Sequence, residues 1–324
     1  MHQTALVALS LVLALCMMRS PVAAELPQLP HVYEVGVLGA GKPEYAVEPM
    51  KALRAAMAEL GWRAGRLHYI ERWANRQDER LSAIVAEMVL LKVDIIVALD
   101  ASSVRAAMRA TDRIPIVFPL AGDPVAEHLV ASLSHPGGNV TGVSAMAPEL
   151  YAKELSLLNE AMPRLRRVGV ITDSANPSAR EIVTALQTTG ARLGIELSFI
   201  DIREPGGVAA HLAQLVPLGI EALTGFVTHP DAKEQCIRFA TENRLPLVGY
   251  TDEPPGLLSL EIDEIGMFRR SASYIDKILR GRRPSELPVE QPMEFRFIVN
   301  LRTANALGLT IPVSLLIRAN DVIR

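Results

Sequence analysis

The 324-residue chain contains only two cysteines, Cys16 and Cys236. Cys16 falls in an N-terminal segment that we expect to be removed on export, so a single cysteine would remain in the mature chain. One cysteine cannot form an internal disulfide, and the fold must therefore be held together by its apolar cores. Cys236 stands beside Gln235 and Ile237 in a helical pattern, which predicts a buried and inert thiol.

The sequence also lacks an excess of positive charge and is poor in aromatic residues. Its formal net charge is -3, its aromatic content is 5%, and its Lys and Arg residues are dispersed. Because nucleic-acid binding needs a basic stripe or a base-stacking surface, we predict no nucleic-acid partner. A hydrophobic content of 49% with 21% charged residues excludes a disordered chain and predicts large buried sheets. The length suits two lobes better than one core.

The apolar run at the N-terminus is too short to cross a membrane. It spans residues 5–18, roughly 14 apolar residues against the ~20 that a bilayer requires. Small residues at 21–24 (Pro-Val-Ala-Ala) then precede Glu25, which predicts a signal peptide over residues 1–24 and a periplasmic mature protein. An uncleaved anchor and a lipid anchor at Cys16, which ends a Leu-Ala-Leu-Cys sequence, are the alternatives.

Motifs of enzymes and nucleotide-binding proteins occur only in part. Residues 36–42 have the outline of a phosphate-binding loop, but Pro43 stands where a magnesium-binding Ser or Thr is required. Residues 142–145 begin like a nucleophile elbow, but Met146 replaces its closing glycine. The seven histidines show no paired spacing suited to zinc. We therefore predict no catalytic residues, no metal and no cofactor.

Short apolar runs alternate with amphipathic segments from residue 34 onward, which is typical of βαβ units and parallel sheets. The first series predicts strands at 34–38, 67–70, 93–99, 116–120 and 140–143. The second predicts strands at 167–172, 195–201, 221–227 and 247–249. A strand at 256–260 is expected to return to the first lobe, a helix at 264–280 to pack there, and 294–299 to cross back. The pattern predicts an α/β fold of two doubly wound parallel-sheet lobes with a three-crossing hinge.

Ligands of open parallel sheets bind beyond the carboxyl ends of the strands, so the turns that follow the strands are the candidate site. Asp100-Ala101-Ser102-Ser103 opens a helix, where Ser or Asp caps the helix and the same turn could bind an anion. Asp123 either bonds its own backbone in a turn or accepts a ligand ammonium. Asn176 is expected to cap the helix that Pro177 begins.

A set of short phrases occurs in a consistent order between Val35 and Ile323. They are Arg72-Trp73-Ala74, Gly122-Asp123-Pro124-Val125, Pro136-Gly137-Gly138-Asn139-Val140-Thr141-Gly142, Ala175-Asn176-Pro177, Arg244-Leu245-Pro246, the Tyr274 to Gly281 segment and the Asn300 to Pro312 segment. With these phrases the chain resembles the tryptophan/tyrosine-type family of ABC-transporter substrate-binding proteins.

The resemblance implies a type I periplasmic-binding-protein fold in a non-enzymatic, monomeric receptor. Such a receptor captures a small amino-acid-like or other organic ligand by closing its hinge, and delivers it to an ABC permease in the inner membrane. We expect lobe 1 to comprise residues 31–145 plus 258–292, and lobe 2 residues 146–257 plus 293–324. The expected ligand-binding residues are Gly39, Ala40, Ser102, Ser103, Asp123, Asn176, His229 and Tyr250. Lys42 is a further candidate by position alone.

Two departures from the family pattern concern the ligand. Asp100 and Ala101 replace a Gly-Thr-Pro-type turn, and the segment from Tyr250 to Glu261 is shortened and lacks an aromatic residue that could stack on a ligand. Two other functions compete with transport: a sensor of the same fold with a membrane signalling partner, and a Rossmann-type enzyme that only the Gly-rich loop after the first strand would support.

Overall fold

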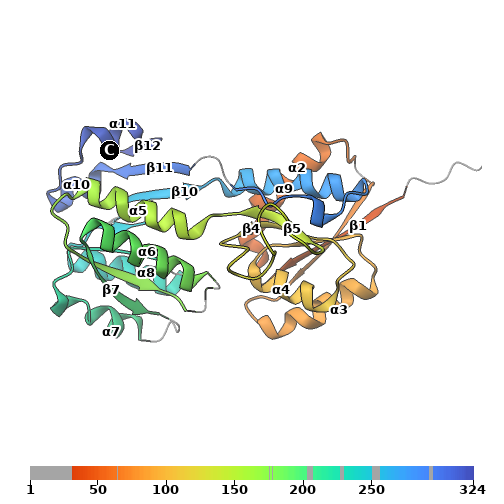
Figure 1. The fold of residues 1–324 in the computed structure, drawn as a ribbon, viewed down its shortest axis with the longest axis horizontal. Coiled ribbons are helices and arrows are strands. Elements are labelled where there is room, and N and C mark those ends of the chain that lie inside the picture. Colours follow the sequence, from red (N-terminus) through yellow and green to blue (C-terminus); the bar gives the residue numbers. More distant parts are fainter. Residues whose placement is uncertain are drawn as a thin grey trace, which may run out of the picture. The chain divides into compact units, whose positions relative to one another are not determined.

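The computed structural model describes residues 31–63, 65–174, 176, 178–202, 207–226, 230–249, 256–291 and 295–324. The predicted signal peptide, Cys16, His229 and Tyr250 lie outside these residues. The described chain contains two sheets, each with helices on both faces (Figure 1). No helix in this part of the chain is both long and apolar enough to span a bilayer.

The first sheet is built from the N-terminal series of strands. Its strands are β1 (Tyr33–Gly39), β2 (Leu67–Trp73), β3 (Ile95–Ala98), β4 (Ile116–Ala121) and β5 (Val140–Ser144). They are all parallel, in the order β2-β1-β3-β4-β5. The central strand β3 is buried on both faces, as its continuous apolar run predicts.

Helices cover the two faces of this sheet. They are α2 (Val47–Glu59), α3 (Leu81–Leu90), α4 (Ala101–Ala110) and α9 (Glu264–Leu279), with the short 3-10 segments η1 (Pro43–Ala46), η2 (Asp78–Arg80) and η4 (Pro284–Glu286). In Figure 1, α2 and α9 lie on one side of the sheet and α3 and α4 on the other. Successive residues of β3 point to opposite faces of the sheet and pack in the apolar core on each face. Ile95 packs with α2 and α9, and Ile96 packs with α3 and α4.

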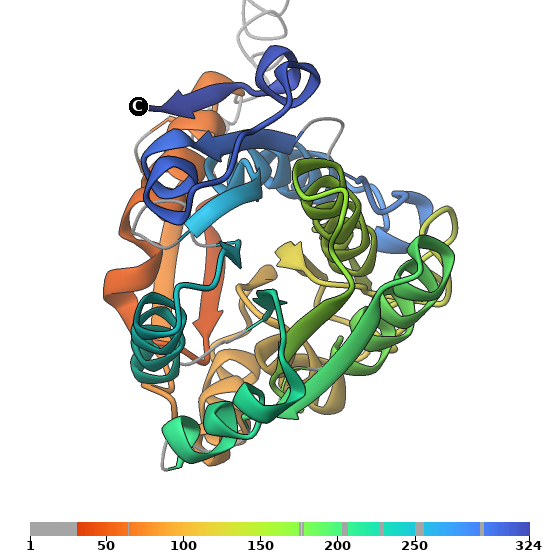
Figure 2. The same ribbon diagram turned by 90° about the vertical axis from the view of Figure 1, so that its left-hand side faces the viewer.

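The second sheet repeats this order and extends it. Its strands are β6 (Arg167–Thr172), β7 (Glu196–Asp201), β8 (Ala222–Gly225), β9 (Leu247–Val248), β10 (Gly256–Ile262), β11 (Phe295–Asn300) and β12 (Asp321–Ile323). The order is β12-β11-β10-β9-β8-β6-β7, so the parallel part β7-β6-β8-β9-β10 matches the first sheet strand for strand. β11 joins antiparallel to β10, and β12 pairs parallel with β11 at the edge seen in Figure 2.

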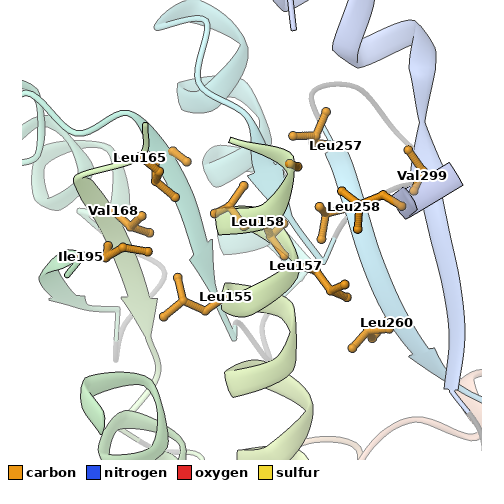
Figure 3. Packing of buried hydrophobic residues seen from close by; sticks show 14 of the residues in the cluster. Leu155, Leu157, Leu158, Leu165, Val168, Ile195, Leu257, Leu258, Leu260 and Val299 are labelled. Atoms are coloured by element: carbon orange, nitrogen blue, oxygen red, sulfur yellow. The ribbon is translucent and has the colours of Figure 1, made fainter. Parts of the chain in front are cut away.

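Apolar cores lie on both faces of the second sheet. Its helices are α5 (Ala147–Ala161), α6 (Ala179–Leu193), α7 (Val208–Ala213), α8 (Pro230–Glu242), α10 (Leu301–Leu307) and α11 (Val313–Arg318), with the 3-10 segment η3 (Val216–Leu218). Leu155 and Leu158 of α5 point toward Val168 of β6 and Leu258 of β10 (Figure 3). Cys236 of α8 is fully buried in the opposite core, which confirms the predicted buried thiol.

The expectation that the strand at 256–260 returns to the first lobe is wrong. β10 pairs with β9 and β11 in the second sheet, so residues 258–262 belong to lobe 2 and not to lobe 1. The chain passes back to the first sheet only at α9, which packs on α2 and so lies in the first lobe, where the sequence predicts this helix. The reason is topological, since β10 supplies the fifth parallel strand that completes the repeated order.

Helix α6 begins later than predicted. Asn176 does not cap it directly, because the helix starts at Ala179 with Ser178 at the N-cap position. Instead the side-chain oxygen of Asn176 accepts a hydrogen bond from the Ser178 N–H at 2.9 Å, which orders the turn that leads into the helix.

Candidate functional site

The carboxyl ends of β1 and β3 meet at the point where the strand order of the first sheet reverses. The Ala40 N–H, just after β1, donates to Asp100 Oδ2 at 2.8 Å, just after β3. Open α/β sheets bind ligands at this kind of switch point. The structure therefore brings together the two turns that contain Ala40 and Ser102, two of the expected ligand-binding residues.

Asp100 serves as the N-cap of α4, which confirms the capping interpretation of this turn. Its Oδ1 accepts from the Ser103 N–H at 2.8 Å, and its Oδ2 also accepts from the Ser103 hydroxyl at 3.0 Å. Ser103 is fully buried, so its hydroxyl faces Asp100 and is not available to a ligand. Ser102 is only partly buried, and it lines a cavity at the carboxyl edge of the sheet.

This first cavity has a volume of about 660 Å³ and is rich in aromatic surface. Trp73 at the end of β2, Phe268 of α9 and Tyr45 of η1 line it together with Ala40 and Lys42. Gly39 contributes by being small, because a Cβ at that position would lie 2.4 Å from the ring of Trp73. The aromatic surface that the shortened Tyr250 segment lacks is thus available from the first lobe.

The turn after β4 touches the start of α6 on the second sheet. Asp123 Oδ1 accepts from the N–H groups of Val125 and Ala126 at 3.1 Å each, which confirms that this aspartate bonds its own turn. The Asp123 N–H donates to Glu127 Oε1 at 3.0 Å and to the Ser178 hydroxyl oxygen at 3.2 Å. The Ser178 hydroxyl in turn donates to Glu127 Oε1. Gly122 permits this approach, since a Cβ there would meet Ser178 Oγ at 2.4 Å.

A second cavity, of about 720 Å³, lies between these two segments and carries charges of both signs. Its lining includes Arg105 of α4 and Glu127 from the first lobe, and Asn176, Arg180 and Asp201 from the second. Ser102 and Arg105 stand three residues apart on α4, so the two cavities flank the first turn of one helix.

Glu127 is the most unusual group in this second cavity. The residue is only 7% exposed, and its Oε2 has no hydrogen-bond partner among the described residues. Buried polar atoms in native proteins are paired with few exceptions, so the unpaired oxygen of this lining residue is a candidate acceptor for a ligand donor. Arg105 and Arg180 form no ion pair within the described ranges, so both guanidinium groups are available to an anion.

Sequence reasoning missed Arg105, Glu127 and Trp73. Each has a simple signal in hindsight: Arg105 follows Ser102 by three residues on a helix, Glu127 follows Asp123 by four, and Trp73 ends a strand. Among the residues that the structure covers, no three His, Cys, Asp or Glu side chains are grouped closely enough to hold a metal ion.

Residues 46–323 match the family described as ABC transporter substrate binding protein, and the chain belongs to this family. The fold is that of the type I periplasmic binding proteins. The match covers every strand of the two sheets except β1, and all the residues named above as lining the two cavities except Ala40, Lys42 and Tyr45.

Three relatives illustrate the similarity. A tyrosine-binding protein of Clostridioides difficile (strain R20291) is 26% identical over 266 residues, which cover 80% of this chain and 76% of that protein. The crystal structure of an ABC domain in complex with L-Trp from Streptococcus pneumonia has a TM-score of 0.81 at 21% identity, covering 90% of this chain and 100% of the other. A periplasmic binding protein type 1 from Bordetella pertussis has a TM-score of 0.56 at 15% identity, covering 71% of this chain and 68% of the other.

Proposed function

We propose that this protein is the extracytoplasmic receptor of an ABC uptake system and that it binds an aromatic amino acid between its two lobes. The observation that carries the proposal is the 720 Å³ cavity, which is lined both by arginines without an ion pair and by Glu127, a buried residue with one unpaired carboxylate oxygen. A zwitterion with a carboxylate and an ammonium group complements that arrangement.

The roles of the residues follow from their chemistry. An arginine binds a carboxylate through parallel hydrogen bonds, so Arg105 or Arg180 takes the ligand carboxylate. Glu127 Oε2 accepts a hydrogen bond from the ligand ammonium, and Asn176 adds a side-chain amide. Ser102 in the first turn of α4 and Trp73 at the end of β2 bind the ligand side chain. The names of the tyrosine-binding relative and of the L-Trp complex favour an aromatic ligand.

Closure of the two lobes would allow a membrane permease to distinguish the liganded receptor from the unliganded one. A ligand that contacts residues of both sheets only in the closed form shifts the population toward that form. The crossings between β5 and α5, between β10 and α9, and between η4 and β11 are the segments about which the lobes would move. An ABC permease would then recognise the closed receptor and accept the ligand. The ligand is released chemically unchanged.

Calorimetric titration of residues 25–324 with L-tryptophan and L-tyrosine tests the proposal, with L-leucine and L-glutamate for comparison. Glu127→Gln and Asn176→Ala should each weaken binding by about 1–3 kcal/mol, or roughly 5- to 150-fold. Arg109→Gln is the matched control for Arg105→Gln, because Arg109 is exposed on the same helix outside the cavity. Small-angle scattering should show compaction, and the ligand should be recovered unaltered.

Two results would count against this reasoning in different ways. If no amino acid binds, the receptor function for this ligand class is wrong. If one binds but Glu127→Gln and Asn176→Ala leave its affinity unchanged, the ligand lies elsewhere.

Export is tested separately by mass spectrometry of the protein from a native membrane fraction and periplasm. The mature chain should begin at Glu25. A diacylated N-terminal Cys16 would make the protein a lipoprotein.

A further inference from the structure

A third cavity lies at the opposite edge of the second sheet. The last turn of α8 leads through Arg244 to the start of β9, which is the amino end of that parallel strand. β11 runs antiparallel to β10, so its last residue, Asn300, and the following helix α10 lie at the same edge. The cavity between α8 and α10 is therefore separate from the carboxyl-edge cavities and independent of the function proposed above.

The lining of this cavity combines basic and apolar groups around a volume of about 370 Å³. The polar lining residues are Thr241, Arg244, Arg302 and Thr303, and the apolar ones are Ala240, Ala306 and Leu307. No acidic residue is among the lining residues that the structure describes. The size is at the lower end of the roughly 300–1,000 Å³ typical of small-molecule sites.

Thr303 has a buried hydroxyl without a partner. The residue is 3% exposed, and its Oγ1 has no hydrogen bond to any described residue. A threonine within a helix usually bonds the carbonyl one turn earlier, but α10 begins at Leu301 and has no such turn before Thr303. The main-chain N–H of Thr303 is already used by Asn300 Oδ1 at 3.1 Å. The hydroxyl is thus an unpaired polar group of a residue that lines the cavity.

The two arginines are held in place by main-chain oxygens and not by carboxylate side chains. Arg244 donates to the Ala306 carbonyl at 3.0 Å, and Arg302 Nε donates to the main-chain oxygen of Arg324. Within the described ranges neither forms an ion pair with Asp or Glu. Each guanidinium carries five N–H donors, so most remain available after these bonds.

We propose that this cavity binds a small organic anion through a carboxylate or phosphate group. Arg302 and Arg244 neutralise its charge, the Thr303 hydroxyl donates to one of its oxygens, and its apolar part packs on Ala306 and Leu307. Planar oxyanions are the groups that arginine binds best, and an anion would also satisfy the buried hydroxyl.

The test uses butyrate, butyl phosphate and butylammonium at one ionic strength, titrated into residues 25–324 and followed by NMR chemical shifts. The three probes share an apolar tail and differ in the head group. At least one of the two anions should bind saturably, and the tighter one identifies the head group. Butylammonium should not bind. Thr303→Val and Arg302→Gln should each weaken the anion by roughly fivefold or more.

Arg113→Gln is the control for loss of a positive charge, because the Arg113 side chain is 94% exposed and lies outside the cavity. A thermal melt of unliganded Thr303→Val checks the fold, and its Tm should not fall, since the valine removes an unpaired polar atom. The proposal is overturned if neither anion binds, if butylammonium binds equally well, or if the two variants bind as tightly as Arg113→Gln.

Discussion

Glu154 makes the stability of this protein depend on pH in a direction opposite to that of most carboxylates. It lies on the inner face of α5, is 2% exposed, and accepts a hydrogen bond from the Leu260 N–H at 2.8 Å. Burial raises the pKa of Glu154 from 4.5 to about 8, the Leu260 N–H opposes the rise, and the negative charge of Glu261 adds to it. The carboxyl is therefore protonated in the folded protein at neutral pH.

The sign of the effect follows from proton counting. Between pH 4.5 and about 8 the folded carboxyl keeps its proton whereas the unfolded one has lost it. The folded state then binds more protons, so the free energy of unfolding falls as pH rises through this window. At pH 7, which is 2.5 units above the unfolded pKa, the loss relative to pH 4 is about 3 kcal/mol.

Glu154→Gln should remove this dependence, because an amide stays neutral and its oxygen can still accept from Leu260. Urea unfolding at pH 4 and pH 7 measures the difference between variant and parent at each pH. The free energy of unfolding of the variant minus that of the parent should be about 3 kcal/mol larger at pH 7 than at pH 4. This difference corresponds to roughly 5–10 °C in Tm. Glu149→Gln, exposed in the first turn of the same helix, should show a much smaller change. Equal differences at pH 4 and pH 7 would mean that Glu154 is ionised in the folded protein, which would refute this reasoning.

Two further predictions concern packing. Gly142→Ala should destabilise the first sheet by more than about 3 kcal/mol, because its Cβ would lie 2.0 Å from the Phe118 carbonyl oxygen and 2.6 Å from the Phe118 ring. Gly138→Ala, where a Cβ meets nothing within 4 Å, is the control, and equal urea midpoints for the two variants would contradict the prediction. Cys236 is fully buried, and burial raises the pKa of its thiol to about 12, so an aromatic disulfide reagent should label it only in denaturant. Rapid labelling of the native protein would show that the surrounding core opens.

Local patterns in the sequence predicted most of the elements. The apolar runs of β3 and β6 and the helical spacing of α9 depend on neighbours within a few residues, and the structure contains all three elements. The cap formed by Asp100 on Ser103 and the turn formed by Asp123 are equally local, because donor and acceptor lie two or three residues apart. Such interactions need only residues that are close in the sequence, so they can be predicted without knowing the tertiary structure.

Only the tertiary structure decided which sheet β10 joins and which side chains share a cavity. An apolar strand can pair with any free sheet edge, and β10 pairs parallel with β9 and antiparallel with β11, as the fifth parallel strand of the second sheet. The unpaired oxygens of Glu127 and Thr303 depend in the same way on what lies across from them. Hydrogen bonding and burial at such positions are set by segments distant in sequence, and a single sequence records the residue types but not their partners.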